Sequence, residues 1–266
     1  MIRKVAENLD KVRSTRPLVH HITNYVTVND CANITLQVGA LPVMADAAEE
    51  VEEMVAIANS LVLNIGTLNP RTVASMLKAG KKANQLGIPV ILDPVGVGAT
   101  SYRTDSTTLI LEEVKISILK GNPAEIGILA GLDAEVRGVE SGEVAGDLLK
   151  AGQRLAARLG NVVVVTGVRD LVLSATRAVT VNNGHPFMGT ITGTGCMCAS
   201  VLGAFGAVVA DPFEAAVSSL VCFGIAGQLA AGDGVKGPGS YRTTFLDRMA
   251  GLTRDDIIRM ASIQDA

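Results

Sequence analysis

The chain has few residues that stack on bases and few that form disulfides. None of its 266 residues is tryptophan, only 3% are aromatic, and the formal net charge is −3. Nucleic-acid binding relies on basic patches and aromatic stacking, so this composition argues against a nucleic-acid partner. The charge gives no reason to expect an anionic membrane surface either. Four cysteines without paired zinc spacing indicate free thiols in a reducing compartment: Cys31, Cys196, Cys198 and Cys222.

Signals for export and for membrane insertion are also missing. Residues 1–17 are charged and amphipathic with no apolar signal-peptide core, so we expect a cytoplasmic protein. Residues 193–210 and 213–231 are apolar, but they lack flanking basic clusters and Trp/Tyr belts and reach at most about 20 residues. We expect two buried helices rather than a membrane hairpin. A hydrophobic content of 48% and the lack of a linker predict one domain over residues 1–266.

Short runs rich in Val, Ile and Leu alternate with helical patterns. These runs predict buried strands over residues 40–44, 61–65, 88–92, 116–119 and 162–166. Helices are predicted over residues 49–59, 70–86 and 143–159. The strands predicted at 171–174 and 177–181, followed by Asn183-Gly184, indicate a hairpin, and only helices are expected after it. The pattern predicts a three-layer α/β/α fold, with a mostly parallel central sheet and an antiparallel edge.

Polar residues stand where the predicted strands end, and ligands bind beyond the carboxyl ends of strands in open α/β sheets. Asp93 and Glu125 are carboxylates suited to Mg²⁺, and Lys120 can pair with a phosphate. Thr166 could bond a nucleotide. Singly, each residue also has a structural explanation, such as a turn, a helix cap or a solvated lysine. Their expected position on one edge favours a joint site.

Gly193-Thr194-Gly195-Cys196 opens a run without a charged residue until Asp211. Small residues of this kind leave the N–H groups of a helix start bare, and such a start attracts anions. The same field favours the thiolate form of a cysteine in the first turn. Taken alone, the tetrapeptide favours a glycine-rich helix start that only packs closely against a neighbour. Together with the polar residues at the strand ends, we interpret it as the place where a transferring phosphate is held. The chain has no P-loop and no G-x-G-x-x-G after a strand, so ATP would have to bind in another way.

The N-terminal third mixes small polar groups with aliphatic residues, over residues 17–26 and 39–44. Such a lining suits a small, mostly apolar ligand with few polar handles. Core packing of Met44 is the alternative explanation. His20 and His21 are adjacent, so on a strand they would face opposite ways and could not share one metal.

Together these segments resemble the hydroxyethylthiazole kinase family of the ribokinase-like superfamily. The motifs that carry the resemblance are Pro17–Asn24, Gly39–Met44, Leu63–Thr67, Ile91–Gly96, Gly121–Glu125, Gly193–Cys196 and Lys236–Ser240. The resemblance implies that ATP phosphorylates the hydroxyethyl group of 4-methyl-5-(2-hydroxyethyl)thiazole in thiamine biosynthesis or salvage. It also implies Mg²⁺, and a homotrimer with active sites between subunits.

The resemblance assigns roles to individual residues. Thiazole binding falls to Asn24, Val26, Gly39, Met44 and Gly193. ATP binding falls to Lys120, Asn122, Glu125 and Thr166, and the metal to Asp93 and Glu125. Cys196 would be a modest base, with Gly193, Thr194 and Gly195 stabilising charge. Two positions depart from the usual pattern: His21 stands where the family usually has Asn, and Lys120 replaces a basic residue that is often Arg.

Other functions on the same fold stay open at this point. One is a kinase for another vitamin alcohol, such as hydroxymethylpyrimidine or pyridoxal. A second is a nucleotide-dependent NAD(P)H-hydrate dehydratase, which releases water. A third is a nucleotide sensor without turnover.

Overall fold

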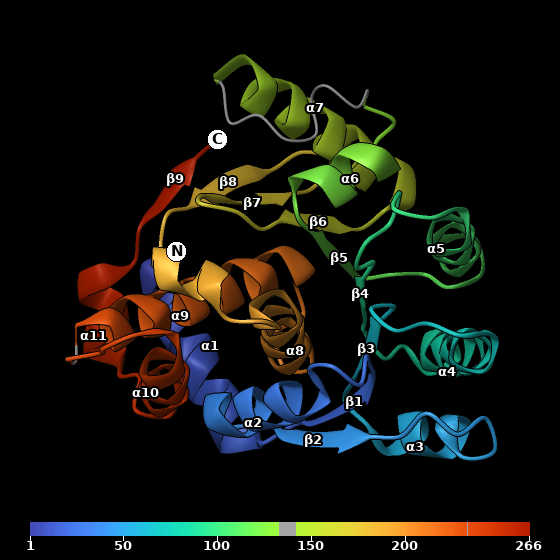
Figure 1. Ribbon diagram of the computed structural model, residues 1–266, viewed down its shortest axis with the longest axis horizontal. Helices are drawn as coiled ribbons and strands as arrows, with labels where there is room; N and C mark the ends of the chain where they lie inside the picture. The colour runs from blue at the N-terminus through green and yellow to red at the C-terminus, as the bar shows by residue number, and fades with distance from the viewer. Residues whose placement is uncertain (133–141, 233) are drawn as a thin grey trace.

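The computed structural model describes residues 1–132, 142–232 and 234–266. In this part of the chain nine strands form one sheet, in the order β2-β1-β3-β4-β5-β6-β7-β8-β9 (Figure 1). The first six strands in that order run parallel, and the last three are antiparallel. Their bounds are β1 Leu18–Ile22, β2 Leu41–Met44, β3 Ser60–Asn64, β4 Val90–Asp93, β5 Ile118–Gly121, β6 Val162–Val165, β7 Asp170–Leu173, β8 Ala178–Val181 and β9 Ile263–Asp265.

The predicted sheet is confirmed, with three corrections. β1 carries two adjacent histidines within its apolar run and was not predicted as a strand, yet it pairs with both β2 and β3. The chain does not close with helices only, because β9 pairs with β8. The hairpin turn lies at Ser174, whose N–H donates to the carbonyl of Arg177. Asn183 instead anchors the chain by donating to Gln228 and to the carbonyl of Met260.

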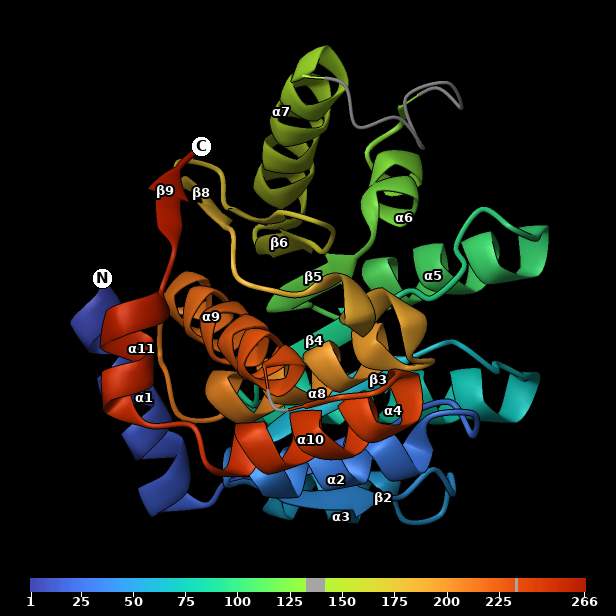
Figure 2. The same ribbon diagram turned by 60° about the vertical axis from the view of Figure 1, so that its left-hand side comes forward.

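Helices cover both faces of the sheet (Figures 1 and 2). One layer holds α3 Val51–Ile57, α4 Pro70–Leu86, α5 Ser101–Glu113, α6 Pro123–Leu129 and α7 Gly142–Leu159. The other holds α1 Ile2–Thr15, α2 Val28–Val38, α8 Thr194–Gly206, α9 Pro212–Ala231, α10 Pro238–Ala250 and α11 Arg254–Met260, and the short 3₁₀ helix η2 Pro186–Thr190 precedes α8. The three-layer prediction is therefore confirmed. The helix predicted at 70–86 matches α4, which starts with Pro70 behind an Asn69 capping box.

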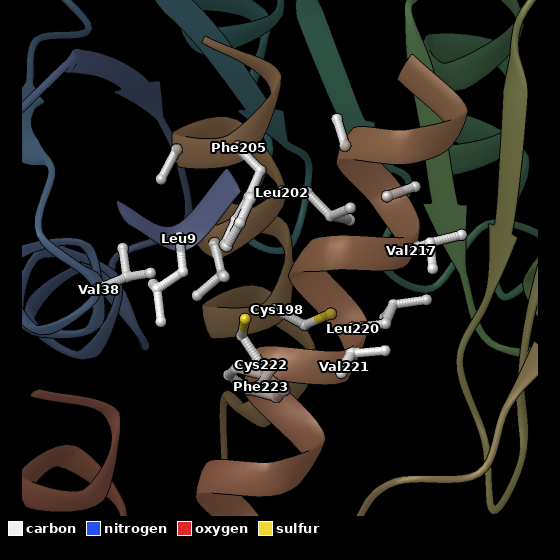
Figure 3. Close-up of a cluster of buried hydrophobic side chains, with 14 of the residues drawn as sticks. Leu9, Val38, Cys198, Leu202, Phe205, Val217, Leu220, Val221, Cys222 and Phe223 are labelled. Carbon is white, nitrogen blue, oxygen red and sulfur yellow. The ribbon is translucent and has the colours of Figure 1, made fainter. Parts of the chain in front are cut away.

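The α8–α9 pair forms the centre of the second layer. Figure 3 shows the two helices side by side, and Leu202 and Phe205 of α8 belong to the same buried apolar cluster as Val217 and Leu220 of α9. α9 is the one helix in the described ranges that is long and apolar enough to cross a membrane, yet 83% of its apolar window is buried inside the protein. This burial fits the prediction of core helices that are apolar on all sides.

Candidate active site

Three neighbouring strands present polar side chains at their carboxyl ends. Asn64 of β3 pairs in register with Asp93 of β4, and Lys120 lies near the end of β5. All three face the α8 layer, because side chains alternate along a strand and the residues two positions earlier pack in the α8 core: Val62, Ile91 and Ile118. The sheet therefore delivers an amide, a carboxylate and an ammonium to one place.

Asp93 and Lys120 form a buried ion pair. Lys120 Nζ lies 3.3 Å from Asp93 Oδ1, and Lys120 and Asp93 are 4% and 0% exposed. Burial raises the pKa of Asp93; Lys120 opposes that shift and Glu125 adds to it. Burial alone would lower the pKa of Lys120, but the surrounding acidic groups, Asp93 foremost, outweigh it and raise that pKa. Lys120 therefore carries a proton and a charge inside the protein.

The start of α8 lies directly against these groups. A Cβ atom at Gly195 would stand 3.0 Å from Lys120 Nζ, so the ammonium sits beside the first turn. Gly193 has φ +90°, and a Cβ there would approach Thr27 Cγ2 to 2.5 Å, so both conformation and space require glycine. No described side chain caps this end of the helix. The bare N–H groups and Lys120 together form an anion-binding corner.

Cys196 stands in the same turn and joins the polar residues of the sheet. It is 9% exposed, and its sulfur accepts a hydrogen bond from Asn24 Nδ2 at 3.4 Å. The same Nδ2 donates to Asn64 Oδ1 at 2.9 Å, and Asn64 Nδ2 donates to Asp93 Oδ2 at 2.9 Å. A continuous hydrogen-bonded chain thus links the thiol to the buried carboxylate.

Glu125 is fixed at the start of α6 by two backbone N–H groups. Its Oε2 accepts from Asn122 N at 2.8 Å, while the Asn122 side chain accepts in return from Glu125 N. Its Oε1 accepts from Gly96 N at 2.9 Å, which connects it to the turn after β4. Asn122 therefore acts as a helix cap in this structure. Glu125 is a preorganised carboxylate at the same edge as Asp93.

This donor set fits a hard divalent cation held with few protein ligands. Within the described ranges, no group of three or more His, Cys, Asp and Glu side chains could hold a metal ion by itself. Mg²⁺ usually keeps several waters and binds one or two carboxylates plus substrate phosphates. Asp93 and Glu125 beside an anion-binding helix start meet that requirement, whereas a closed zinc cage would not.

Thr166 lies at the same edge, after β6. Its N–H and its hydroxyl both donate to the carbonyl of Gly121, at 2.9 and 3.4 Å. Close by, the carboxylate of Asp170 accepts from Gly167 N at 2.9 Å. Burial raises the pKa of Asp170 to about 7, with Gly167 and Lys120 opposing the shift. This turn offers a hydroxyl and a titratable carboxyl next to Lys120.

The residues predicted to bind thiazole are not all brought together within one chain. Val26 is 58% exposed on the loop before α2, and Met44 ends the outermost strand at the active-site edge. Gly39 lies at the far end of α2, which at 1.5 Å per residue is about 16 Å long. A Cβ there would meet Arg13 Cγ at 2.7 Å, so Gly39 ends the helix against α1 instead of lining the site with Asn24.

Three residues of the site were missed from the sequence: Asn64, Arg103 and Asp170. Asn64 ends a predicted strand, and that position was the available signal. Arg103 of α5 donates to the carbonyls of Ile65, Gly66 and Val95 at 2.8 to 2.9 Å, so it joins the turns after β3 and β4. No local pattern marks this role, because its partners are backbone atoms of distant turns.

Comparison with known proteins gives a family match over nearly the whole chain. The profile of the hydroxyethylthiazole kinase family matches residues 9–255. The chain is 58% identical over 252 residues to the hydroxyethylthiazole kinase of Thermoanaerobacter pseudethanolicus, covering 94% of this chain and 96% of that protein. It is 52% identical to the enzyme of the same name from Methanoculleus marisnigri, covering 97% and 92% of the two chains.

The chain belongs to the hydroxyethylthiazole kinase family. It is therefore a kinase, that is, a phosphotransferase. The structure of the hydroxyethylthiazole kinase from Pyrococcus horikoshii superposes with a TM-score of 0.91 at 41% identity, covering 99% of both chains. A ribokinase-like protein from Enterococcus faecalis superposes at 0.67 with 16% identity, over 95% of each chain, which supports the fold alone. The expected ribokinase-like fold is confirmed. The two other enzymatic functions considered for this fold, phosphorylation of another vitamin alcohol and dehydration of hydrated NAD(P)H, are not favoured.

Proposed function

We propose that this kinase transfers the γ-phosphoryl group of ATP to the hydroxyethyl group of 4-methyl-5-(2-hydroxyethyl)thiazole in thiamine biosynthesis or salvage, acting in the cytoplasm. Family membership over residues 9–255 supports the acceptor. The single structural observation that supports phosphoryl transfer is the uncapped start of α8, with Lys120 on one side and Cys196 in its first turn. A phosphoryl group, which is negatively charged, fits this anion-binding corner, and a reacting alcohol fits beside the thiol.

The chain's own residues supply positioning and charge stabilisation. The N–H groups of Thr194, Gly195 and Cys196 and the ammonium of Lys120 would hold the transferring phosphoryl group. Cys196 would take the hydroxyl proton, while the alcohol oxygen forms the new P–O bond and ADP leaves with the electrons of the old one. The transition state is loose, so a modest base suffices. The nucleotide would lie between Thr166 and Asn122. The thiazole would lie against Val26, Met44 and Gly193.

Asp93 and Glu125 would hold Mg²⁺ directly or through its waters. Bound there, the cation would neutralise phosphate charge. Asp93 would remain ionised through the donors on both of its oxygens, Lys120 Nζ on Oδ1 and Asn64 Nδ2 on Oδ2. Glu125 would keep its orientation through two backbone N–H groups. Both carboxylates are thus held in fixed positions by donors on each of their oxygens.

We also propose a single domain that assembles as a homotrimer with active sites between subunits. Apolar side chains near the site support this: Tyr25 and Val26 are 78% and 58% exposed on the loop before α2. The edge strand β2, which ends in Met44, is only partly covered. A second subunit would bury both and would close the open side of the thiazole pocket. Gly39 would reach a thiazole only as part of a neighbour's wall.

A coupled ADP-release assay tests the proposed activity. The purified protein with ATP and Mg²⁺ is offered the thiazole alcohol, hydroxymethylpyrimidine, pyridoxal and hydrated NADH in parallel. We expect ADP release with the thiazole alcohol to exceed that with every other compound. Cys196→Ala should lower turnover, and Cys196→Asp should retain or raise it, because an aspartate is ionised at neutral pH. Release no faster than the substrate-free blank would refute the assignment, and sedimentation would test the trimer.

A further inference from the structure

The side chain of Asn24 has no hydrogen-bonding capacity left for a substrate. Its Oδ1 accepts from the N–H and from the hydroxyl of Thr27, both at 3.1 Å. Its Nδ2 donates to Asn64 Oδ1 at 2.9 Å and to Cys196 Sγ at 3.4 Å. A primary amide has two N–H bonds and two acceptor positions, so all four are occupied. Asn24 is also only 4% exposed.

Backbone donors fix which way both amides point. A backbone N–H can only donate, so Thr27 N requires the oxygen of Asn24 on its side and leaves the amino group facing Cys196. Gly66 N likewise donates to Asn64 Oδ1 at 2.9 Å, so the amino group of Asn64 faces Asp93. An ionised carboxylate can only accept, so Asp93, at the other end of this hydrogen-bonded series, requires the same orientation of both amides. The network therefore has one consistent arrangement.

Packing prevents Asn24 from turning toward a ligand. A Cβ atom at Gly66 would stand 2.9 Å from the Asn24 side chain, so that side chain already fills the space above the turn after β3. Thr27, which holds the amide oxygen, is itself in contact with Gly193. Rotation of Asn24 would break four hydrogen bonds in a site closed by these two glycines.

The donor that faces Cys196 determines what its sulfur can do. A hydrogen bond donated to a sulfur stabilises the thiolate more than the thiol, because the acceptor gains negative charge. We infer that Asn24 is a positioning residue for the Cys196 thiol, held by Thr27 and Asn64, and not a thiazole-binding residue. The inference rests on the proposed function only where it gives Cys196 the role of proton acceptor.

A double-mutant cycle separates the two roles. Asn24→Asp is isosteric and keeps both acceptor positions toward Thr27, but it replaces the amino group that donates to Cys196 and to Asn64 with an oxygen. With ATP and the thiazole alcohol we expect kcat to fall about 10- to 100-fold, the loss of a charge-assisted hydrogen bond, and KM for the alcohol to stay within about twofold. In the Cys196→Ala background the same substitution should change kcat less than about twofold.

A substrate-binding role for Asn24 predicts the opposite outcome. KM for the alcohol would rise, and Asn24→Asp would cost the same with or without the thiol; that result would overturn the inference. Asn59→Asp is the matched control, because exposed Asn59 also accepts a backbone N–H through Oδ1, from Leu18 at 2.8 Å at the opposite end of the strands. It should leave kcat and the pH profile unchanged.

Alkylation by iodoacetamide provides a readout that needs no kinase activity. The labelling rate of Cys196 is followed against pH by mass spectrometry in the wild type, Asn24→Asp and Asn24→Ala. We expect the pH of half-maximal labelling to rise in both variants, and not in Asn59→Asp. Burial raises the pKa of Cys31 to about 11 and that of Cys198 to about 12, so these thiols label slowly.

Asn24→Ala introduces no buried charge, so it remains informative if the aspartate variant does not fold. An unchanged labelling profile in a folded variant would overturn the inference. A shifted profile in a protein that does not phosphorylate the thiazole alcohol would refute the proposed function and leave the inference standing.

Discussion

Replacing Lys120 with methionine removes the cation that contacts Asp93 and keeps an unbranched aliphatic side chain of similar length. The pair is buried, with Lys120 Nζ 3.3 Å from Asp93 Oδ1. The variant would leave a carboxylate inside the protein without its counter-charge. We therefore expect a loss of folding stability that is much larger than the loss caused by removing a surface lysine.

The distance sets the size of the expected loss. Two unit charges 3.3 Å apart interact by about 5 kcal/mol at an effective dielectric constant of about 20. Breaking a buried pair by removal of one partner typically costs about 3–5 kcal/mol. At roughly 2–4 °C per kcal/mol for a chain of this size, the melting temperature should fall by roughly 6–20 °C at pH 8.

The pH dependence distinguishes lost charge from lost packing. Without Lys120, burial and Glu125 raise the pKa of Asp93 further above its ordinary value than in the wild type. The folded variant then binds a proton at a pH where the unfolded chain does not. A pKa raised in the folded state means that stability is gained as the pH falls through it. The deficit of Lys120→Met should therefore be largest at pH 8 and smaller near pH 5.

Lys81→Met is the matched control for this measurement. Lys81 pairs with Glu113 at 2.6 Å, but both side chains are about half exposed, and such pairs contribute about 0–1 kcal/mol. Adding Asp93→Asn to Lys120→Met should recover part of the lost stability, because the uncompensated charge is gone. Denaturant unfolding at fixed protein concentration gives the free energy of unfolding of the wild type, of the two single variants and of the double variant. A Lys120→Met deficit no larger than that of Lys81→Met, or one independent of pH, would refute the reasoning.

Three further outcomes are expected from other parts of the structure. Gly193→Ala should lose about 1–2 kcal/mol for its left-handed backbone, plus the clash with Thr27, whereas Gly239→Ala, which meets nothing within 4 Å, should change stability little in thermal melts. Burial lowers the pKa of His21 to about 4. Between pH 6.5 and 4 the unfolded chain therefore binds a proton that the folded chain does not, and folding stability decreases as the pH is lowered. His21→Asn should remove about 3 kcal/mol of this fall when denaturant unfolding is compared at pH 7 and pH 4. Glu125→Gln should raise the Mg²⁺ concentration needed for half-maximal kcat, and an unchanged titration would exclude a metal role.

The strand ends were the part of the site that the sequence could predict. Continuous apolar runs marked β4 to β6, and in a parallel sheet their carboxyl ends meet at one edge. The order of residues along the chain therefore suffices to place Asp93, Lys120 and Thr166 together, with the glycine-rich start of α8 opposite them. Local patterns are enough here because each of these residues lies within one residue of the end of a strand.

Strands whose signal is non-local were missed. β1 has the sequence Leu-Val-His-His-Ile, in which two ionisable residues interrupt the apolar run. Both histidines are nevertheless buried, and burial lowers the pKa of each, so they remain neutral inside the sheet. β9 has three residues and no periodicity of its own; it forms because β8 offers an open edge.

The hydrogen bonds between side chains could not be predicted from the sequence for a related reason. The role of Asn64 depends on where Gly66 N, Asn24 and Asp93 stand around it, and those positions come from β3, β4 and the loop before α2. Arg103 depends in the same way on three carbonyls of two turns. A motif can indicate that an amide or a guanidinium is available at a position. Only the packed structure shows which of its hydrogen-bonding positions are already occupied. That occupancy decides whether the group can bind a ligand or only orient a neighbour.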